Sequence, residues 1–107
     1  MEARIVVHGT NTERVALWDW LFDDADLRDL LGRDASIEVD AAGEYVVLAE
    51  GPVAIWPVLA RTLGAWIERW RATVTITGPA GRAVVSPGRA EAALRQVLGV
   101  REFSTPA

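Results

Sequence analysis

The chain has 107 residues, half of them hydrophobic and 24% charged, which fits one globular domain and excludes a disordered chain. Its formal net charge of -4 argues against nonspecific nucleic-acid binding, and the lack of cysteine excludes disulfides, thiolate metal sites and cysteine nucleophiles. The longest apolar stretch, 53–67, is interrupted by proline, arginine and glycine and is too short to cross a membrane. No signal peptide is visible, so we expect a cytoplasmic protein.

The first third of the chain predicts a strand followed by helices. Arg4–His8 contains three consecutive aliphatic residues, which favours a central strand. Thr10 and Glu13 match the capping-box pattern and predict that a helix follows. An aspartate-rich segment interrupts this helix, and we expect it to restart at Asp26 and to end at Gly32. The apolar face of the first helix consists of Val15, Leu17, Trp18, Leu21 and Phe22.

Two further segments read as strands. Ser36–Asp40 alternates polar and apolar residues, as a half-exposed strand does. Glu44–Ala49 would return beside it after a tight turn, but the same run could also begin a helix, and this choice stays open at the level of sequence.

The longest predicted helix begins between Val53 and Pro57 and ends near Arg71. Its apolar residues recur at spacings of four, three and four, which predicts one buried stripe. Because the stripe carries two large aromatic residues, we expect it to pack on a sheet. The stripe consists of Leu59, Leu63, Trp66 and Trp70.

The last third predicts a hairpin and a helix. Ala72–Thr77 and Arg82–Ser86 form the hairpin strands, and Pro87 occupies the first position of a helix that Gly99 ends. The predicted fold is therefore an α+β two-layer sandwich of order β-α-β-β-α-β-β-α. It has a ferredoxin-like core with an added strand and a C-terminal helix. Residues 1–100 would form a single domain, and 101–107 a C-terminal tail.

Candidate interaction residues cluster around the interruption of the first helix. Several carboxylates there could form a solvated face, a divalent-metal site or a docking patch for an arginine-rich partner; the spacing lacks the glycine and distal glutamate of a calcium loop. Trp20 and Trp56 fall off the main apolar rows, so either could be an exposed anchor or could cover a sheet edge. The predicted partner-binding residues are Trp20, Asp23, Asp24, Asp26, Asp29, Arg69 and Arg71.

His8 is the only histidine, and it lies at the end of a predicted strand. A lone histidine in such a place is more often structural than catalytic, because general-base chemistry needs a placed partner. No nucleophile-elbow motif and no phosphate-binding loop accompany it. A small hydrolase that uses His8 and an acidic residue is therefore only a third hypothesis, and we expect no catalytic residues, no metal site and no cofactor.

Five segments resemble the effector-associated constant component family: Arg4–Val7, Leu17–Arg28, Leu59–Arg69, Val74–Arg82 and Ala92–Gly99. The resemblance covers nearly the whole chain, and 40–50 matches least. It implies a small non-enzymatic component of bacterial conflict or defence systems. Such components are encoded beside regulatory NTPases and effectors such as caspase-like or trypsin-like proteases.

The resemblance leads to the first hypothesis for function. The protein would be an adaptor or protein-interaction module that links a regulatory NTPase to an effector such as a protease. A homo-oligomer is also possible, while nucleic acid and membrane are not expected partners. The alternative is a small-molecule-sensing regulatory domain of ferredoxin-like type.

Overall fold

The chain folds into one sheet with helices, as predicted for an α+β protein. The computed structural model describes residues 1–33, 35–49 and 55–100. The predicted tail 101–107 and the part of the longest helix expected before Ile55 lie outside the described residues. In chain order the elements are β1 (Glu2–His8), α1 (Asn11–Asp23), α2 (Ala25–Leu30), β2 (Ala35–Val39), β3 (Tyr45–Ala49), α3 (Ile55–Trp70), β4 (Thr73–Gly78), β5 (Gly81–Val85) and α4 (Ala90–Leu98).

The five strands lie in the order β2-β3-β1-β4-β5, and every neighbouring pair is antiparallel. β1 is central, as its aliphatic run predicts, and pairs with β3 on one side and β4 on the other. The 44–49 run, open between strand and helix in the sequence, is the strand β3. The narrower assignment to a ferredoxin-like core stays a prediction.

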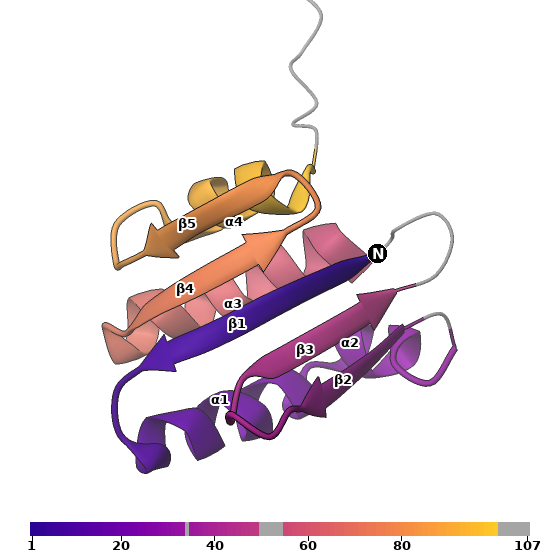
Figure 1. Cartoon of the computed structure of the whole chain (residues 1–107), viewed down its shortest axis with the longest axis horizontal. Helices are drawn as coiled ribbons and strands as arrows, with labels where there is room; N and C mark the ends of the chain where they lie inside the picture. The colour runs from indigo at the N-terminus through magenta and orange to yellow at the C-terminus, as the bar shows by residue number, and fades with distance from the viewer. Residues whose placement is uncertain (34, 50–54, 101–107) are drawn as a thin grey trace, which may run out of the picture.

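The helices lie on one face of the sheet, and together they make two layers (Figure 1). Alternate strand residues such as Ile5, Val47 and Ile76 point into the layer between sheet and helices and are fully buried. From the helix side, Leu17, Leu21, Leu59, Leu63, Trp66, Leu94 and Leu98 join the same core. Trp66, at the centre of the predicted stripe, has no exposed surface.

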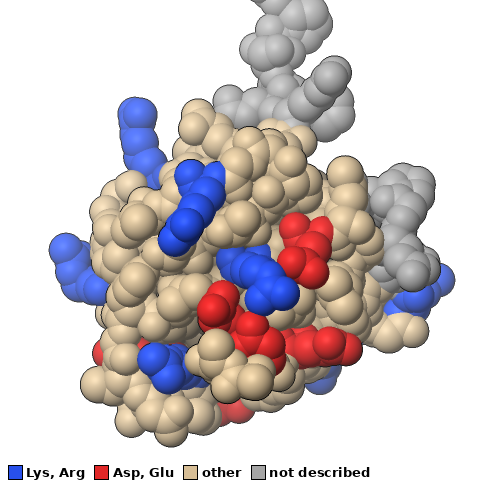
Figure 2. All heavy atoms as spheres, viewed as in Figure 1, with Lys and Arg blue, Asp and Glu red and all other residues tan. Residues whose placement is uncertain are grey.

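The opposite face of the sheet carries no helix of the described residues, and it faces the viewer in Figure 2. Acidic and basic side chains gather near the middle of this face. Arg4 of β1 pairs there with Glu2 at 2.9 Å and with Asp40 at 3.0 Å. Asp40 also closes the hairpin between β2 and β3, because its other oxygen accepts the backbone N–H of Ala42 and of Glu44.

Two predicted helix starts are wrong. The side chain of Asp24, not Asp26, caps α2 by accepting the N–H of Leu27 at 2.9 Å. The last helix begins at Ala90 rather than at Pro87. Its first turn is held by a side chain from α3, because the Glu68 carboxylate accepts the N–H of Gly88 and of Ala90. Because Glu68 is distant from Pro87 in sequence, the residues around Pro87 do not indicate that the helix begins at Ala90.

Two predicted core residues are exposed. Trp70 is 45% exposed because it is the last residue of α3, where it stacks on Trp66 with the ring centroids 6.3 Å apart. Val15 is 51% exposed, since only the Leu17 and Leu21 row of α1 is fully buried. Trp56 is instead 1% exposed, so it is a core residue and not a surface anchor. Among the described residues, no helix has the length and apolar character needed to cross a membrane.

Candidate functional site

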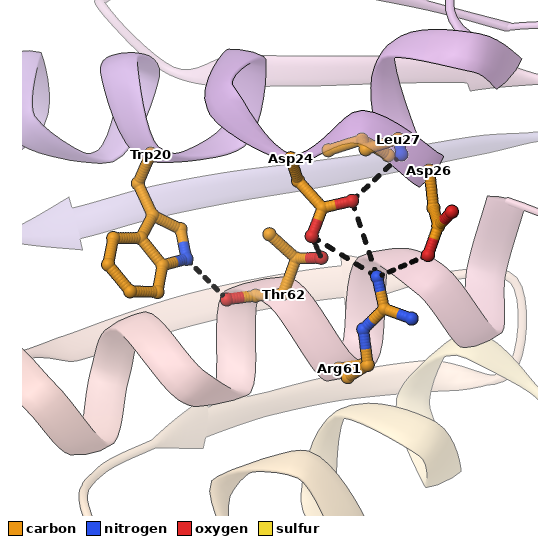
Figure 3. Close-up of polar contacts among 6 residues, drawn as sticks. All are labelled: Trp20, Asp24, Asp26, Leu27, Arg61 and Thr62. Atoms are coloured by element: carbon orange, nitrogen blue, oxygen red, sulfur yellow. Dashed lines mark hydrogen bonds and ion pairs between the residues drawn. The ribbon is translucent and has the colours of Figure 1, made fainter.

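Trp20 fixes α1 to α3. Its indole Nε1–H donates to the backbone carbonyl of Thr62 at 2.9 Å (Figure 3). The ring is partly buried and packs against the core. Trp20 is therefore half-buried and held to α3 by this hydrogen bond.

Asp24 is the polar centre of the junction between α1, α2 and α3. Besides capping α2, its carboxylate accepts the Thr62 hydroxyl at 3.1 Å and pairs with Arg61 at 3.1 Å (Figure 3). Partial burial by itself raises the pKa of Asp24. The hydrogen bonds from Leu27 and Thr62 and the charge of Arg61 outweigh burial, so the pKa lies below its ordinary value.

Arg61 forms ion pairs with two of the carboxylates in the predicted acidic patch, Asp24 and Asp26. The same guanidinium nitrogen that reaches Asp24 also lies 3.2 Å from Asp26. Further along α2, Asp29 pairs with Arg33 at 3.6 Å, with both side chains mostly exposed. Asp24, Asp26 and Asp29 thus already have cationic partners within the chain. Their charges are less available to an incoming protein than the sequence suggested.

Two carboxylates of α1 differ from these three in having no ion-pair partner among the described residues. Asp19 and Asp23 are exposed, and neither takes part in an ion pair within the part of the chain that the structure describes. Both border open grooves on the helix layer. Sequence reasoning included Asp23 among the partner-binding residues but left out Asp19.

The two grooves meet at Trp20 and Asp23. The first, here the Arg61 groove, has a volume of about 330 Å³ and is lined by Trp20, Asp23, Asp24, Arg61, Thr62 and Ala65. The second, here the Trp70 groove, has a volume of about 650 Å³ and is lined by Ala16, Trp18, Asp19, Trp20, Phe22, Asp23 and Trp70. Four of the seven residues in the Trp70 groove are aromatic. The structure therefore brings together aromatic rings and two carboxylates that are not paired among the described residues.

Trp70 was missed as a surface residue because its helical spacing assigned it to the core, whereas Trp18 and Phe22 are half-buried, pack against the core and also line the groove. A usable signal was present for Trp70. It is the last apolar residue of its stripe and is followed directly by Arg71 and Ala72, so the helix end can leave it uncovered. Trp18 lies tilted by 41° against Phe22 at a centroid distance of 4.4 Å and stacks on Tyr45 of β3 at 5.8 Å.

The predicted basic residues Arg69 and Arg71 lie at the end of α3 and are exposed. Among the described residues, no ion pair joins either of them to the acidic residues of α1 and α2. Arg71 ends the helix in a left-handed conformation with φ of 51°. The N–H groups of Gly88 and Ala90 lower the pKa of Glu68, and the charge of Arg71 adds to this.

His8 lies on the open face of the sheet. Its Nε2 shares a hydrogen bond of 2.5 Å with the Thr75 hydroxyl of β4. A histidine–acid hydrolase would need a carboxylate bonded to the ring. Among the described residues, no carboxylate bonds to His8. Within the same residues, no group of three or more histidine or acidic side chains could hold a metal ion.

The family model described as Effector Associated Constant Component 1 matches residues 7–101, which is nearly the whole chain. No curated protein and no solved structure matches the chain. The family resemblance predicted from the sequence is thereby confirmed.

Proposed function

The chain belongs to the Effector Associated Constant Component 1 family, and on that premise we propose that it is a non-enzymatic protein-binding adaptor. In this proposal it acts in the cytoplasm of a bacterium, needs no cofactor, and links a regulatory NTPase to an effector such as a protease. One of these partners occupies the surface between α1 and α3.

The observation that carries the proposal is the aromatic Trp70 groove. Trp70 is 45% exposed at the edge of a groove that is also lined by Trp18, Trp20 and Phe22. Tryptophan is the residue most often found at the energetic centre of protein interfaces. Because the hydrogen bond to Thr62 already holds Trp20, this ring loses little conformational entropy when a partner binds.

The predicted partner-binding residues have unequal roles in this proposal. Trp20 and Asp23 line both grooves and contact the partner. Asp24, Asp26 and Asp29 act indirectly, because their intrachain ion pairs shape the surface. Arg69 and Arg71 flank Trp70 at the end of α3 and would meet the edge of the interface. The small-molecule-sensing alternative has no observation in its favour among the described residues.

The test is binding of the purified protein to the effector and the NTPase encoded beside it. Wild-type protein should form a stoichiometric complex with at least one of them. Trp70→Ala should weaken that complex by about 2 kcal/mol, or roughly thirtyfold in Kd, as the loss of an interface anchor does. Its own fold should persist, since the aromatic pair with Trp66 contributes only about 0.5–1.5 kcal/mol.

Val84→Thr provides the matched control. Val84 is 66% exposed, but it belongs to β5 and is absent from both grooves. Its replacement should leave binding unchanged. Equal binding by wild-type and Trp70→Ala proteins would place the interface elsewhere, and failure of every encoded neighbour to bind would overturn the adaptor function.

A further inference from the structure

Asp19 and Asp23 have unfavourable electrostatic interactions within their own helix, α1. They stand four residues apart on α1, so their Cβ atoms lie about 6 Å from each other on one face, where like charges repel. Asp23 is the last residue of α1, next to the negative end of the helix dipole, and the last turn contains no basic residue. Because no ion pair with Asp19 or Asp23 forms among the described residues, we expect this pair to lower the stability of the unbound fold.

The surroundings of the pair fit a flat cation. Both carboxylates border the Trp70 groove, whose walls include the indoles of Trp20 and Trp70. The hydrogen bond to Thr62 holds Trp20, and stacking on Trp66 supports Trp70. Two acceptors one helical turn apart in a groove lined by aromatic side chains offer ion pairing and cation–π contact to the same group.

From this arrangement we propose that the Trp70 groove binds an arginine side chain of the protein partner. The guanidinium lies between Asp19 and Asp23, and its plane stacks on an indole of the groove. Arginine fits better than lysine, because its planar group donates to two carboxylates at once, stacks on aromatic rings and is more weakly hydrated. This inference rests on the proposed function, since it names the chemistry of the partner at the same surface.

The intrachain pairing of Arg61 supports the same chemistry. Arg61 lies between Asp24 and Asp26 with distances of 3.1 and 3.2 Å to their carboxylates, and it lines the adjoining groove. One arginine between two carboxylates is therefore an arrangement that this surface already contains. The Asp19 and Asp23 pair repeats the acidic half of that arrangement on α1 and lacks its arginine among the described residues.

The probe is a capped seven-residue peptide of glycine and serine with one central arginine, alongside its lysine counterpart. The readout is the set of indole N–H signals in nitrogen-15 NMR spectra of the full chain, which contains five tryptophans. The arginine peptide should shift the Trp70 and Trp20 signals in a saturable way. The buried Trp56 and Trp66 signals should stay in place and serve as internal references.

Matched variants separate the specific site from general acidity. The double variant Asp19→Asn, Asp23→Asn should raise the dissociation constant of the arginine peptide by about tenfold, the effect of losing two exposed ion pairs. Glu38→Gln, which removes one exposed carboxylate of β2 that borders neither groove, should leave it unchanged. The lysine peptide should bind more weakly than the arginine peptide to the wild-type protein.

Each remaining outcome decides between the two proposals. Equal binding of the lysine and arginine peptides, or full binding by the double variant, would overturn the arginine inference. If Trp70→Ala abolishes the partner complex but the double variant binds the partner normally, the proposed function stands and the arginine inference falls. If Trp70→Ala leaves the partner complex intact, the Trp70 groove is not the partner-binding surface, whether or not the peptide binds to it.

Discussion

Replacement of Asp24 tests how the helix layer is held together. Asp24→Ala removes the cap of α2, which costs about 1 kcal/mol. It also leaves the hydroxyl of Thr62, a residue that is 3% exposed, without its acceptor, at about 1–3 kcal/mol. The half-exposed ion pair with Arg61 adds at most about 1 kcal/mol. We therefore expect a loss of roughly 2–5 kcal/mol in the free energy of unfolding.

Asp24→Asn removes the negative charge of residue 24 but keeps a side chain that can cap α2, so it measures the contribution of the charge alone. Asparagine caps helices as well as aspartate does. When its one oxygen accepts the Leu27 N–H, its NH2 group takes the place of the second Asp24 oxygen and can donate to the Thr62 hydroxyl oxygen. The loss should therefore be well under half of that for Asp24→Ala. Urea unfolding followed by tryptophan fluorescence measures both variants. Asp29→Ala is the control, because its exposed pair with Arg33 should contribute less than about 0.5 kcal/mol.

The pH dependence supplies a second measurement of the same contact. The folded-state pKa of Asp24 lies below its ordinary value, so between the two values the unfolded chain binds more protons than the folded one. The stabilisation is complete above the ordinary pKa and is lost as the pH falls through the lowered one. Wild-type stability should thus fall more steeply than that of Asp24→Asn below about pH 4. Parallel curves, or an Asp24→Ala protein as stable as Asp29→Ala, would refute this account of the junction.

Three other outcomes follow from the structure. Trp66→Ala should cost about 3–5 kcal/mol, because the ring is fully buried, and a melting temperature within a degree or two of the parent would contradict its core position. His8→Ala should leave the output of a reconstituted system intact, and a folded but inactive variant would revive the hydrolase hypothesis. Partner association should slow as added salt screens Asp19 and Asp23, and stopped-flow rates independent of salt would argue against electrostatic steering by this pair.

The sequence predicted the features that depend on neighbours along the chain. Thr10 and Glu13 form the capping box that opens α1, and Gly99 ends α4 in a left-handed conformation with φ of 72°. The aliphatic run of β1 predicted its central place in the sheet. Burial of Trp66 follows from the helical period of its stripe. In each case the deciding physics acts within a few residues.

The features that sequence missed depend on contacts between distant segments. Asp24 and Arg61 lie 37 positions apart, so nothing local indicates that one arginine pairs with two of the predicted docking carboxylates. Glu68 holds the first turn of α4 from 20 positions away, which moved the helix start beyond Pro87. The exposure of Trp70 depends on where α3 ends relative to its neighbours. Periodicity alone does not contain that information.

The last prediction separates carboxylates that build the fold from those that serve binding. Asp24 stabilises the unbound protein, whereas Asp19 and Asp23 repel each other and Asp23 opposes the helix dipole. Asp23→Asn should therefore raise the free energy of unfolding by about 0.3–1 kcal/mol, and Asp19→Asn by about 0.2–0.5 kcal/mol. A gain in stability together with weaker partner binding is the exchange expected at a functional site. Urea unfolding of the two variants beside Asp24→Asn measures the contrast. If Asp23→Asn instead destabilised the protein as Asp24→Ala does, the Asp23 carboxylate would be stabilising the fold. The argument that the Trp70 groove binds a cation of the partner would then fail.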